Sequence, residues 1–378
     1  MTRIFPAAVA LALLAGCGKP VRVGAIVSRT GAASFYGDQV ARGFDLAVEQ
    51  INASGGVAGR KLELIYRDDS TNPEIGLAAL RELIEQERVR TVLGAVSSTV
   101  TLRLAPYCER NHVVLMSPSA SAPQLTDAGE YIFRTYPSDV LEGVSMADFA
   151  RDLGLDRVAV LAVDNAYGES LARAFGERLH AAGGSVVASL TFPEGDEAAI
   201  ATAVAALPPL APRGLYVPAY VADVATVLKL LHATRLRPIV LGTSAAAPDL
   251  IREAGPAAEN LVFPMSVFDA TADSASVRAF AAAFAARYAA EPDVYAAHAY
   301  DTVRVLASAV ERGGSWDADD IRGALLRMND YDGATGRLVF DRNGDVVQYP
   351  RLYVVRGGQI VAYDKFVEGG GVLPVPAR

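Results

Sequence analysis

A serine-containing loop at residues 94–99 is suited to binding an anion. It lies between a predicted strand and a helix predicted from about residue 98 to 111. Ser98 or Thr99 could cap this helix, whose first N–H groups have no partner within the helix and would suit a carboxylate. The alternative is that the hydroxyl only caps the helix and binds no ligand.

A second loop, residues 117–123, carries three serines and two prolines. It also follows a predicted strand, at residues 113–116, so it should lie at the same sheet edge as the first loop. Three hydroxyl groups on a stiff loop offer several hydrogen-bond donors to a small polar ligand. The alternative is an ordinary turn, in which serine and proline are common.

Tyrosines occur where three other predicted strands give way to helices. Tyr36, Tyr167 and Tyr220 each stand in such a loop. A tyrosine offers a flat apolar face and one hydroxyl, which suits the enclosure of a small organic molecule. One such residue could simply pack at the surface, but three on separate strand ends favour a cleft. Ser244, in the loop at 241–244, has the same position, and that loop carries no charge.

No pattern in the sequence predicts catalysis, a metal site or a cofactor. Residues 242–246 lack the second glycine of a nucleophile elbow, and no phosphate loop or dinucleotide fingerprint is present. Residues 108–112 hold one cysteine and one histidine, too few for zinc. No ligand spacing relates the four histidines, which are His112, His180, His232 and His298. We therefore expect a protein that is not an enzyme.

The elements that must position these loops alternate between strand and helix. Residues 21–27 form a predicted strand, apolar residues between 40 and 51 recur at helical spacing, and residues 62–66 form the next strand. Such units give parallel sheets covered on both faces, with binding groups at the strand ends. Further strands are predicted at 91–95, 113–116, 131–135, 158–163, 186–190, 215–217, 239–241 and 261–264.

The last third of the chain departs from this alternation. Residues 274–291 and 292–312 are predicted to form two alanine-rich helices, which alanine favours by its helix propensity rather than by forming a binding face. Short strands should follow, joined by turns at Asn343-Gly344 and Gly357-Gly358. No low-complexity linker separates the domains, which favours lobes joined by several crossings.

The first residues predict export. Arg3 precedes a short apolar run at residues 4–14, which is too short to span a bilayer. The LAGC motif at residues 14–17 has the form of a lipobox. We expect residues 1–16 to be a lipoprotein signal peptide and Cys17 to carry the lipid anchor. The alternative is a plain secretory signal with an incidental cysteine.

Size and charge limit what the mature chain can be. Removing the first 16 of 378 residues leaves 362, enough for two domains. The formal net charge of −8 becomes −9 because Arg3 is lost, which disfavours nucleic acid as a partner. Cys108 is then the one cysteine besides Cys17, so no internal disulfide is expected.

The order of several short motifs resembles that of the leucine/isoleucine/valine-binding proteins of bacterial ABC transporters, across nearly the whole mature chain. The motifs are YGDQ (36–39), INASGG (51–56), GAVSS (94–98), SPSASAP (117–123), FRTYPSD (133–139), AYGESLA (166–172) and AYDTV (299–303). The resemblance implies a type I periplasmic-binding fold, an α/β architecture of two doubly wound parallel-sheet lobes joined by three crossovers around a ligand cleft. The N-terminal lobe would hold residues 21–138 and 268–349, and the C-terminal lobe residues 139–267 and 350–378.

The resemblance also implies roles for residues in the cleft. The positions that bind an amino acid's carboxylate in the family match Ser98, Ser119 and Ser121. The family's tyrosines around the ligand match Tyr36, Tyr167 and Tyr220. The glutamate that pairs with the ligand's ammonium matches Ser244, and here the chain departs from the family.

This departure matters because an ammonium buried without a counter-charge costs several kcal/mol. Either another acid reaches the ammonium, or the ligand is a carboxylate, an amide or another small polar molecule without one. Asp139 is the nearest candidate acid. Its alternative role is the N-cap of a helix predicted at 141–153.

The expected function is delivery of a small-molecule ligand to ABC permease subunits by hinge closure. The protein would be periplasmic and would contact the membrane through its lipid anchor only. The alternative is an envelope lipoprotein of the same fold that acts as a ligand sensor or as a regulator of envelope machinery.

Overall fold

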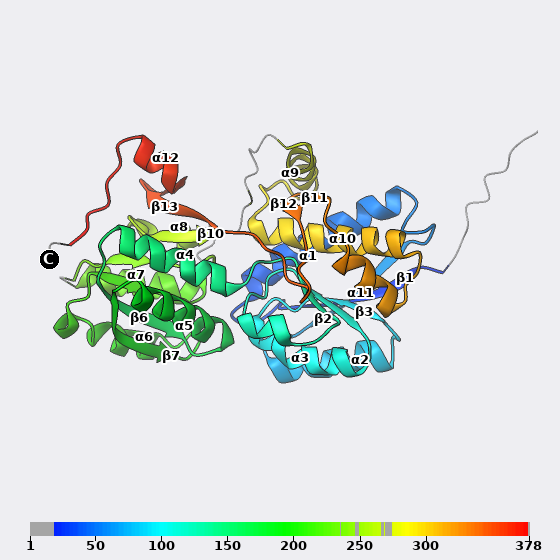
Figure 1. The fold of residues 1–378 in the computed structure, drawn as a ribbon, viewed down its shortest axis with the longest axis horizontal. Helices are drawn as coiled ribbons and strands as arrows, with labels where there is room; N and C mark the ends of the chain where they lie inside the picture. Colours follow the sequence, from blue (N-terminus) through cyan, green and yellow to red (C-terminus); the bar gives the residue numbers. More distant parts are fainter. Residues whose placement is uncertain (1–18, 235, 246–248, 266–267, 269–273, 377–378) are drawn as a thin grey trace, which may run out of the picture.

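The computed structural model describes residues 19–376 except 235, 246–248, 266–267 and 269–273. Cys17 and the predicted signal peptide lie outside the described residues, so the lipid anchor stays a prediction. Figure 1 shows two α/β lobes side by side along the longest axis of the molecule. Each lobe is built around its own sheet.

The N-terminal lobe contains five parallel strands in the order β2-β1-β3-β4-β5. Their bounds are β1 (Val21–Val27), β2 (Leu62–Asp68), β3 (Thr91–Leu93), β4 (Val114–Ser117) and β5 (Ile132–Arg134). The middle strands are covered on both faces. Ile26 packs in the core cluster on one face, and its neighbour Ala25 packs in the cluster on the other. This alternation explains why these strands are apolar throughout.

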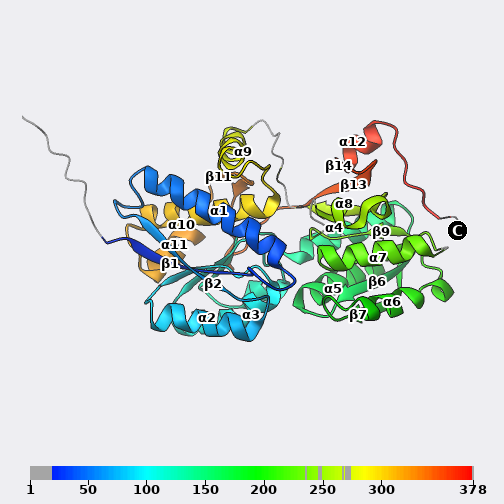
Figure 2. The ribbon, with the colours of Figure 1, turned by 180° about the vertical axis from the view of Figure 1, so that it is seen from behind.

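Helices cover both faces of this sheet (Figures 1 and 2). One face carries α2 (Pro73–Glu85) and α3 (Ser98–Arg110), and the opposite face carries α1 (Ser34–Ala53) and α10 (Val294–Gly313). The remaining elements of this lobe are a 3-10 turn η1 (Pro123–Asp127), α9 (Ala275–Tyr288), α11 (Ala318–Leu326), β11 (Tyr331–Gly333) and β12 (Gly336–Leu338). The lobe is thus completed by a part of the chain that is distant in sequence.

The C-terminal lobe contains a seven-stranded sheet in the order β14-β13-β10-β9-β8-β6-β7. Five strands are parallel: β6 (Arg157–Val163), β7 (Ser185–Phe192), β8 (Gly214–Tyr216), β9 (Ile239–Leu241) and β10 (Val262–Met265). The last two, β13 (Arg351–Arg356) and β14 (Gln359–Ala362), form an antiparallel hairpin at the edge. Gly357 and Gly358 turn this hairpin with positive φ, as the Gly-Gly pair predicts.

The helices of this lobe again lie on both sides of its sheet (Figure 2). They are α4 (Asp139–Asp152), α5 (Ala166–Ala181), α6 (Glu197–Ala205), α7 (Val221–Ala233), α8 (Asp249–Ala254) and α12 (Tyr363–Glu368), with 3-10 turns η2 (Pro208–Leu210) and η3 (Gly255–Ala258). The chain passes between the lobes before α4, after β10 and before β13. The predicted fold class is therefore confirmed, and the lobe boundaries at residues 139, 268 and 350 stay a prediction.

A buried ion pair joins two of the segments that lead to these crossings. Nε and Nη2 of Arg134, at the end of β5, donate to the two carboxylate oxygens of Asp345, each at 2.6 Å. Arg134 is 1% exposed and also donates to the carbonyl of Ala122 at 2.9 Å. The bidentate geometry offsets the cost of burying the two charges. The pair fixes the ends of both segments to the N-terminal lobe.

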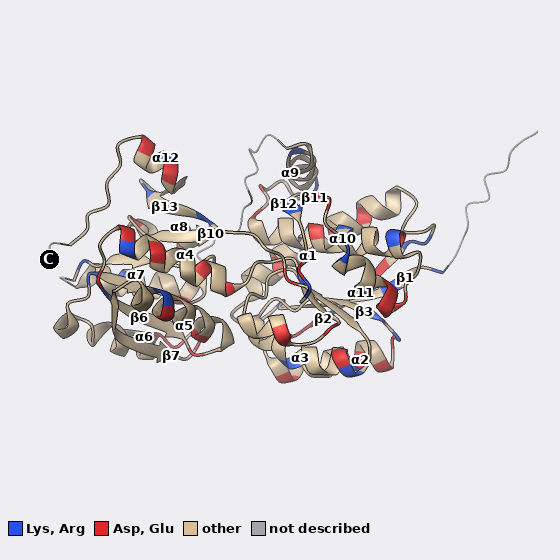
Figure 3. Cartoon of the chain, viewed as in Figure 1, with Lys and Arg blue, Asp and Glu red and all other residues tan. Residues whose placement is uncertain are grey.

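Acidic and basic side chains are interspersed over the helices of both lobes (Figure 3). Within the described ranges, every helix is too short or too polar to cross a membrane.

Candidate ligand-binding site

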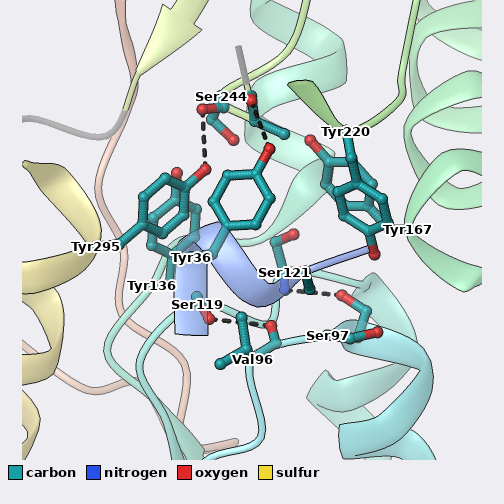
Figure 4. A pocket seen from close by; sticks show the side chains of 13 residues that line it. Tyr36, Val96, Ser97, Ser119, Ser121, Tyr136, Tyr167, Tyr220, Ser244 and Tyr295 are labelled. Carbon is teal, nitrogen blue, oxygen red and sulfur yellow. Dashed lines mark hydrogen bonds between the residues drawn. The ribbon is translucent and has the colours of Figure 1, made fainter. Parts of the chain in front are cut away.

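A small cavity lies between the two lobes, with a volume of about 30 Å³ that water-sized molecules can enter. All seven residues predicted to bind the ligand line it, and Figure 4 labels each of them except Ser98. The full lining is Ala33, Tyr36, Val96, Ser97, Ser98, Ser119, Ser121, Tyr136, Tyr167, Tyr220, Ser244, Ala245 and Tyr295. None of these side chains is charged. Their ligand-binding role stays a prediction, but the structure brings them together around one cavity.

The N-terminal lobe contributes a wall of four serines, Ser97, Ser98, Ser119 and Ser121, here called the serine wall. Its hydroxyls join the loop after β3 to the loop after β4. Ser98 Oγ accepts from the N–H groups of Ser121 and Ala122 at 3.1 and 3.2 Å. Ser119 Oγ donates to the carbonyl of Val96 at 3.0 Å. These bonds hold both loops in place without a ligand atom.

The prediction that Ser98 or Thr99 caps helix α3 is wrong. The helix begins at Ser98, the N-cap position belongs to Ser97, and no side chain makes a capping bond there. The hydroxyls have other partners, because Ser98 Oγ holds the second loop and Thr99 Oγ1 accepts from Ala166 N at 3.3 Å. The first N–H groups of α3 therefore have no capping side chain and suit an anion at this end of the cavity.

The C-terminal lobe contributes Tyr167, Tyr220 and Ser244, here called the tyrosine wall. The rings of Tyr167 and Tyr220 stack with centroids 5.5 Å apart and an interplanar angle of 5°. Asn165 caps α5 by accepting from Tyr167 N and Gly168 N, which fixes Tyr167 at the start of the helix. Tyr167 OH donates to Thr243 Oγ1 at 2.8 Å. The stacked rings form a flat apolar surface.

Two tyrosines of the N-terminal lobe make hydrogen bonds across the cleft (Figure 4). Tyr36 OH donates to the carbonyl of Ala245 at 2.9 Å and accepts from Val221 N at 3.0 Å. Tyr295 OH donates to the carbonyl of Ser244 at 3.0 Å. These three bonds join the lobes directly.

Tyr136 and Tyr295 line the cavity but were not predicted as site residues. Their rings stack with centroids 6.1 Å apart and an interplanar angle of 2°. Tyr136 follows β5, so the rule that singled out the other tyrosines could have found it. Tyr295 lies in the first turn of α10, which Asp293 caps through Ala296 N. No strand precedes it, so the sequence carried no such signal.

Two fully buried hydroxyls of the cavity have no hydrogen-bond partner within the described part of the chain. They are Tyr136 OH and Tyr220 OH, and both atoms are buried. Burial raises the pKa of both phenols, so both remain neutral. An unpaired buried hydroxyl costs about 1–3 kcal/mol. A ligand with polar atoms at these two places would recover that cost.

Asp139 does not line the cavity. It is 1% exposed, and its Oδ2 accepts from Ser170 Oγ at 2.6 Å. Burial raises its pKa to about 6. The alternative role as N-cap is wrong, because α4 begins at Asp139 and Ser138 holds the cap position. Its role as an ammonium partner stays a prediction.

Glu142 is a second buried acid beside the cavity, and no prediction named it. Its Oε1 accepts from Ser244 N at 3.0 Å, and the residue is 6% exposed. Burial, and then the charge of Asp139, raise the pKa of its carboxyl to about 8. Acids in the first turn of a helix commonly complement the helix dipole. The sequence therefore gave no reason to distinguish Glu142 from an ordinary surface glutamate.

Within the described residues, no group of three or more His, Cys, Asp or Glu side chains could hold a metal ion. The polar groups of the cavity are hydroxyls and backbone amides, with a carboxyl directly behind Ser244. This arrangement can bind and enclose a small polar molecule.

Comparisons with known proteins agree with this geometry. A family model described as "Periplasmic binding protein" matches residues 20–359. The chain is 29% identical over 330 residues to "Leu/Ile/Val-binding protein homolog 3" of Brucella melitensis, covering 86% of this chain and 88% of the relative. Two solved structures are also similar. The leucine binding protein LivK of Thermotoga maritima has a TM-score of 0.86 at 26% identity, covering 90% of this chain and 97% of the other. LivJ of Streptococcus pneumoniae, in complex with isoleucine, has a TM-score of 0.82 at 26% identity, covering 91% and 98%.

Proposed function

This chain belongs to the periplasmic binding protein family, and from that premise we propose that it is the solute-binding component of an ABC transporter of the branched-chain-amino-acid type. Its ligand would be a small amino acid or a related carboxylate or amide. The names of the relatives, Leu/Ile/Val-binding protein and leucine binding protein, support this class of ligand.

The observation that carries the proposal is the pair of buried, unpaired hydroxyls in the cavity between the lobes, on Tyr136 and Tyr220. They flank a serine wall whose loops are already held in place, and the amides at the start of α3 have no side-chain cap. The ligand's anionic end would bind these amides and serine hydroxyls. Its body would lie against the stacked rings of Tyr167 and Tyr220.

The mechanism would be hinge closure. Each lobe contributes one wall, so a ligand that contacts both walls favours the arrangement in which they meet. The hydrogen bonds of Tyr36 and Tyr295 across the cleft would form in the same step. The closed form would then deliver its ligand to the permease.

The proposal includes export and lipidation at Cys17, which makes the protein periplasmic and membrane-anchored. Palmitate labelling in cells tests this part. Label should enter the wild-type protein and be absent from Cys17→Ser, and equal labelling of both would contradict the anchor.

Ligand binding is tested by a thermal-shift screen of residues 18–378 against α-amino acids, carboxylates and amides. At least one compound should raise the melting temperature of the wild-type protein. The double variant Ser98→Ala with Tyr220→Ala should lose this stabilisation, because it removes one polar group from each wall. The matched control is Ser54→Ala with Tyr349→Ala, two exposed positions, Tyr349 being 67% exposed. Unchanged stabilisation in the first double variant would show that the ligand binds elsewhere.

A further inference from the structure

Glu142 places a carboxyl group directly behind the cavity wall. Its Oε1 lies 3.0 Å from Ser244 N, and Ser244 lines the cavity. The carboxyl comes from α4, in the same lobe, and is 6% exposed. It is therefore separated from the cavity by a single residue.

Both backbone polar groups of Ser244 are bonded. Its N–H donates to Glu142, and its carbonyl accepts from Tyr295 OH at 3.0 Å. Because these bonds come from opposite lobes, the backbone of Ser244 is fixed when the lobes meet. Its side chain lines the cavity and also interacts with the carboxyl of Glu142 behind it.

Among the described residues, no positively charged group acts on Glu142. The titratable groups that face it from the neighbouring elements are Asp139, Tyr136, Tyr167, Tyr216 and Tyr295. Arg134, which faces Asp139 from β5, is already paired with Asp345. A buried carboxyl in such a place is stable as an anion only when a cation is brought to it.

We propose that Glu142 acts as a positioning residue that supplies, through Ser244, the negative charge opposite a ligand's ammonium group, so that the site selects zwitterionic ligands. This inference rests on the proposed function and names its ligand class. The ligand's carboxylate would face the serine wall and the amides of α3, and its ammonium would face the Ser244 hydroxyl. A carboxylate ligand without an ammonium would leave Glu142 without its cation.

The arrangement couples binding to a proton. Burial raises the pKa of Glu142 to about 8, so its carboxyl is mostly protonated at pH 7. An arriving ammonium favours the ionised form, and the carboxyl then releases its proton. Affinity for zwitterions should therefore rise between pH 7 and 8, by at most about tenfold. Asp139, with a pKa of about 6, is mostly ionised across this range and contributes little.

Isothermal titration of the purified mature protein tests the inference. Each α-amino acid is paired with the carboxylic acid that lacks its amino group, such as leucine with isocaproate and valine with isovalerate. Titrations at pH 7 and 8 in phosphate and in Tris count the protons released. The wild-type protein should prefer the amino acid and should release up to one proton at pH 7.

Three variants locate the effect. Glu142→Gln keeps the acceptor for Ser244 N and should weaken amino-acid binding roughly tenfold to a hundredfold while abolishing proton release. Asp139→Asn should keep the preference for amino acids but release fewer protons, because the charge of Asp139 helps to raise the pKa of Glu142. Asp223→Asn is the matched control, because it removes another buried acid of the same lobe, bonded to Gly195 N and outside the cavity lining.

The outcomes separate the two proposals. Binding of the carboxylic acids alone, or equal binding of both members of a pair, overturns the role of Glu142 and leaves the proposed function standing. If Asp139→Asn abolishes the preference for amino acids and Glu142→Gln keeps it, the role of Glu142 is also overturned. If the wild-type protein binds none of the compounds, both the role of Glu142 and the proposed function are overturned. If Glu142→Gln does not fold, the proton count of the wild-type protein decides, and amino-acid binding without proton release at pH 7 overturns the inference.

Discussion

The two walls of the cavity differ in how their polar groups are satisfied. The serine wall is held by its own hydrogen bonds, since Ser98 and Ser119 join the two loops of the N-terminal lobe. On the opposite side, the hydroxyl of Tyr220 has no partner in the described residues, and the carboxyl of Glu142 has no cation nearby. The comparison teaches that the loops of one wall are held in place before a ligand arrives, whereas the other wall keeps a buried hydroxyl and a buried carboxyl that a ligand could satisfy. Substitutions on the two walls should therefore affect stability and binding differently.

The largest expected effect is that of Ser98→Ala on the serine wall. The change leaves the buried N–H groups of Ser121 and Ala122 without an acceptor. The free energy of unfolding should fall by roughly 2–4 kcal/mol, and ligand affinity should fall with it. Urea denaturation without ligand measures the first quantity. The control is Ser145→Ala, whose hydroxyl bonds only within α4. A Ser98→Ala protein as stable as this control would contradict the account of the serine wall.

Next in size is Tyr36→Phe, which removes two hydroxyl bonds across the cleft. The closed arrangement should lose on the order of 1–3 kcal/mol relative to the open one. Fluorescence energy transfer between labels on the two lobes measures this shift. Tyr66→Phe is the control, since its hydroxyl bonds to Asp45 within one lobe. An unchanged lobe distance in Tyr36→Phe would mean that these bonds do not hold the lobes together.

A smaller effect is the pH dependence of stability caused by Glu142, which lies behind Ser244 of the tyrosine wall. The pKa of Glu142 is about 8 in the folded protein against 4.5 for a free glutamate, so between these values the folded state holds a proton that the unfolded state lacks. Stability must therefore fall as pH rises through this range, by about 1 kcal/mol between pH 7 and 8. Denaturation without ligand at both pH values should show the fall in wild type and not in Glu142→Gln. Asp223→Asn should keep it, because the pKa of Asp223 is about 6. If the stability of Glu142→Gln falls equally between pH 7 and 8, another titratable group causes the fall.

The smallest effect on stability is that of Tyr220→Phe. Its hydroxyl has no partner to lose, so the free energy of unfolding without ligand should stay within about 0.5 kcal/mol of wild type. Ligand affinity should nevertheless fall by roughly tenfold, because one hydrogen bond to the ligand is lost. Denaturation and titration of the same protein measure the two quantities. If Tyr220→Phe loses as much stability as Ser98→Ala, the difference between the serine wall and the tyrosine wall is contradicted.

Much of the fold follows from hydrophobic periodicity. Every strand predicted within the two sheets is present, with its ends within two residues of the predicted ones. Short apolar runs between amphipathic helices admit few other arrangements. No prediction covered α2, α8, α11 or α12. The short helices α8 and α12, of six residues each, are too brief to show a clear period.

The site residues also divide into those that the sequence could predict and those that it could not. Tyr36, Tyr167, Tyr220 and the serine loops follow strands, and the ends of parallel strands gather at one edge of a sheet. Tyr295 and Glu142 lie in helical first turns, where position along the chain says nothing about which side chain reaches the cleft. Their contact through Ser244 depends on how two lobes meet. Such a contact is tertiary and leaves no local pattern.

The bonds of Tyr36 and Tyr295 across the cleft also bear on how long a ligand stays bound. They join protein to protein and involve no ligand atom. Departure must wait until they break, so the escape rate is limited by a step common to all ligands. Compounds of unequal affinity should then have more similar residence times than their affinities suggest. The rate of ligand release would be set by the opening of the two lobes.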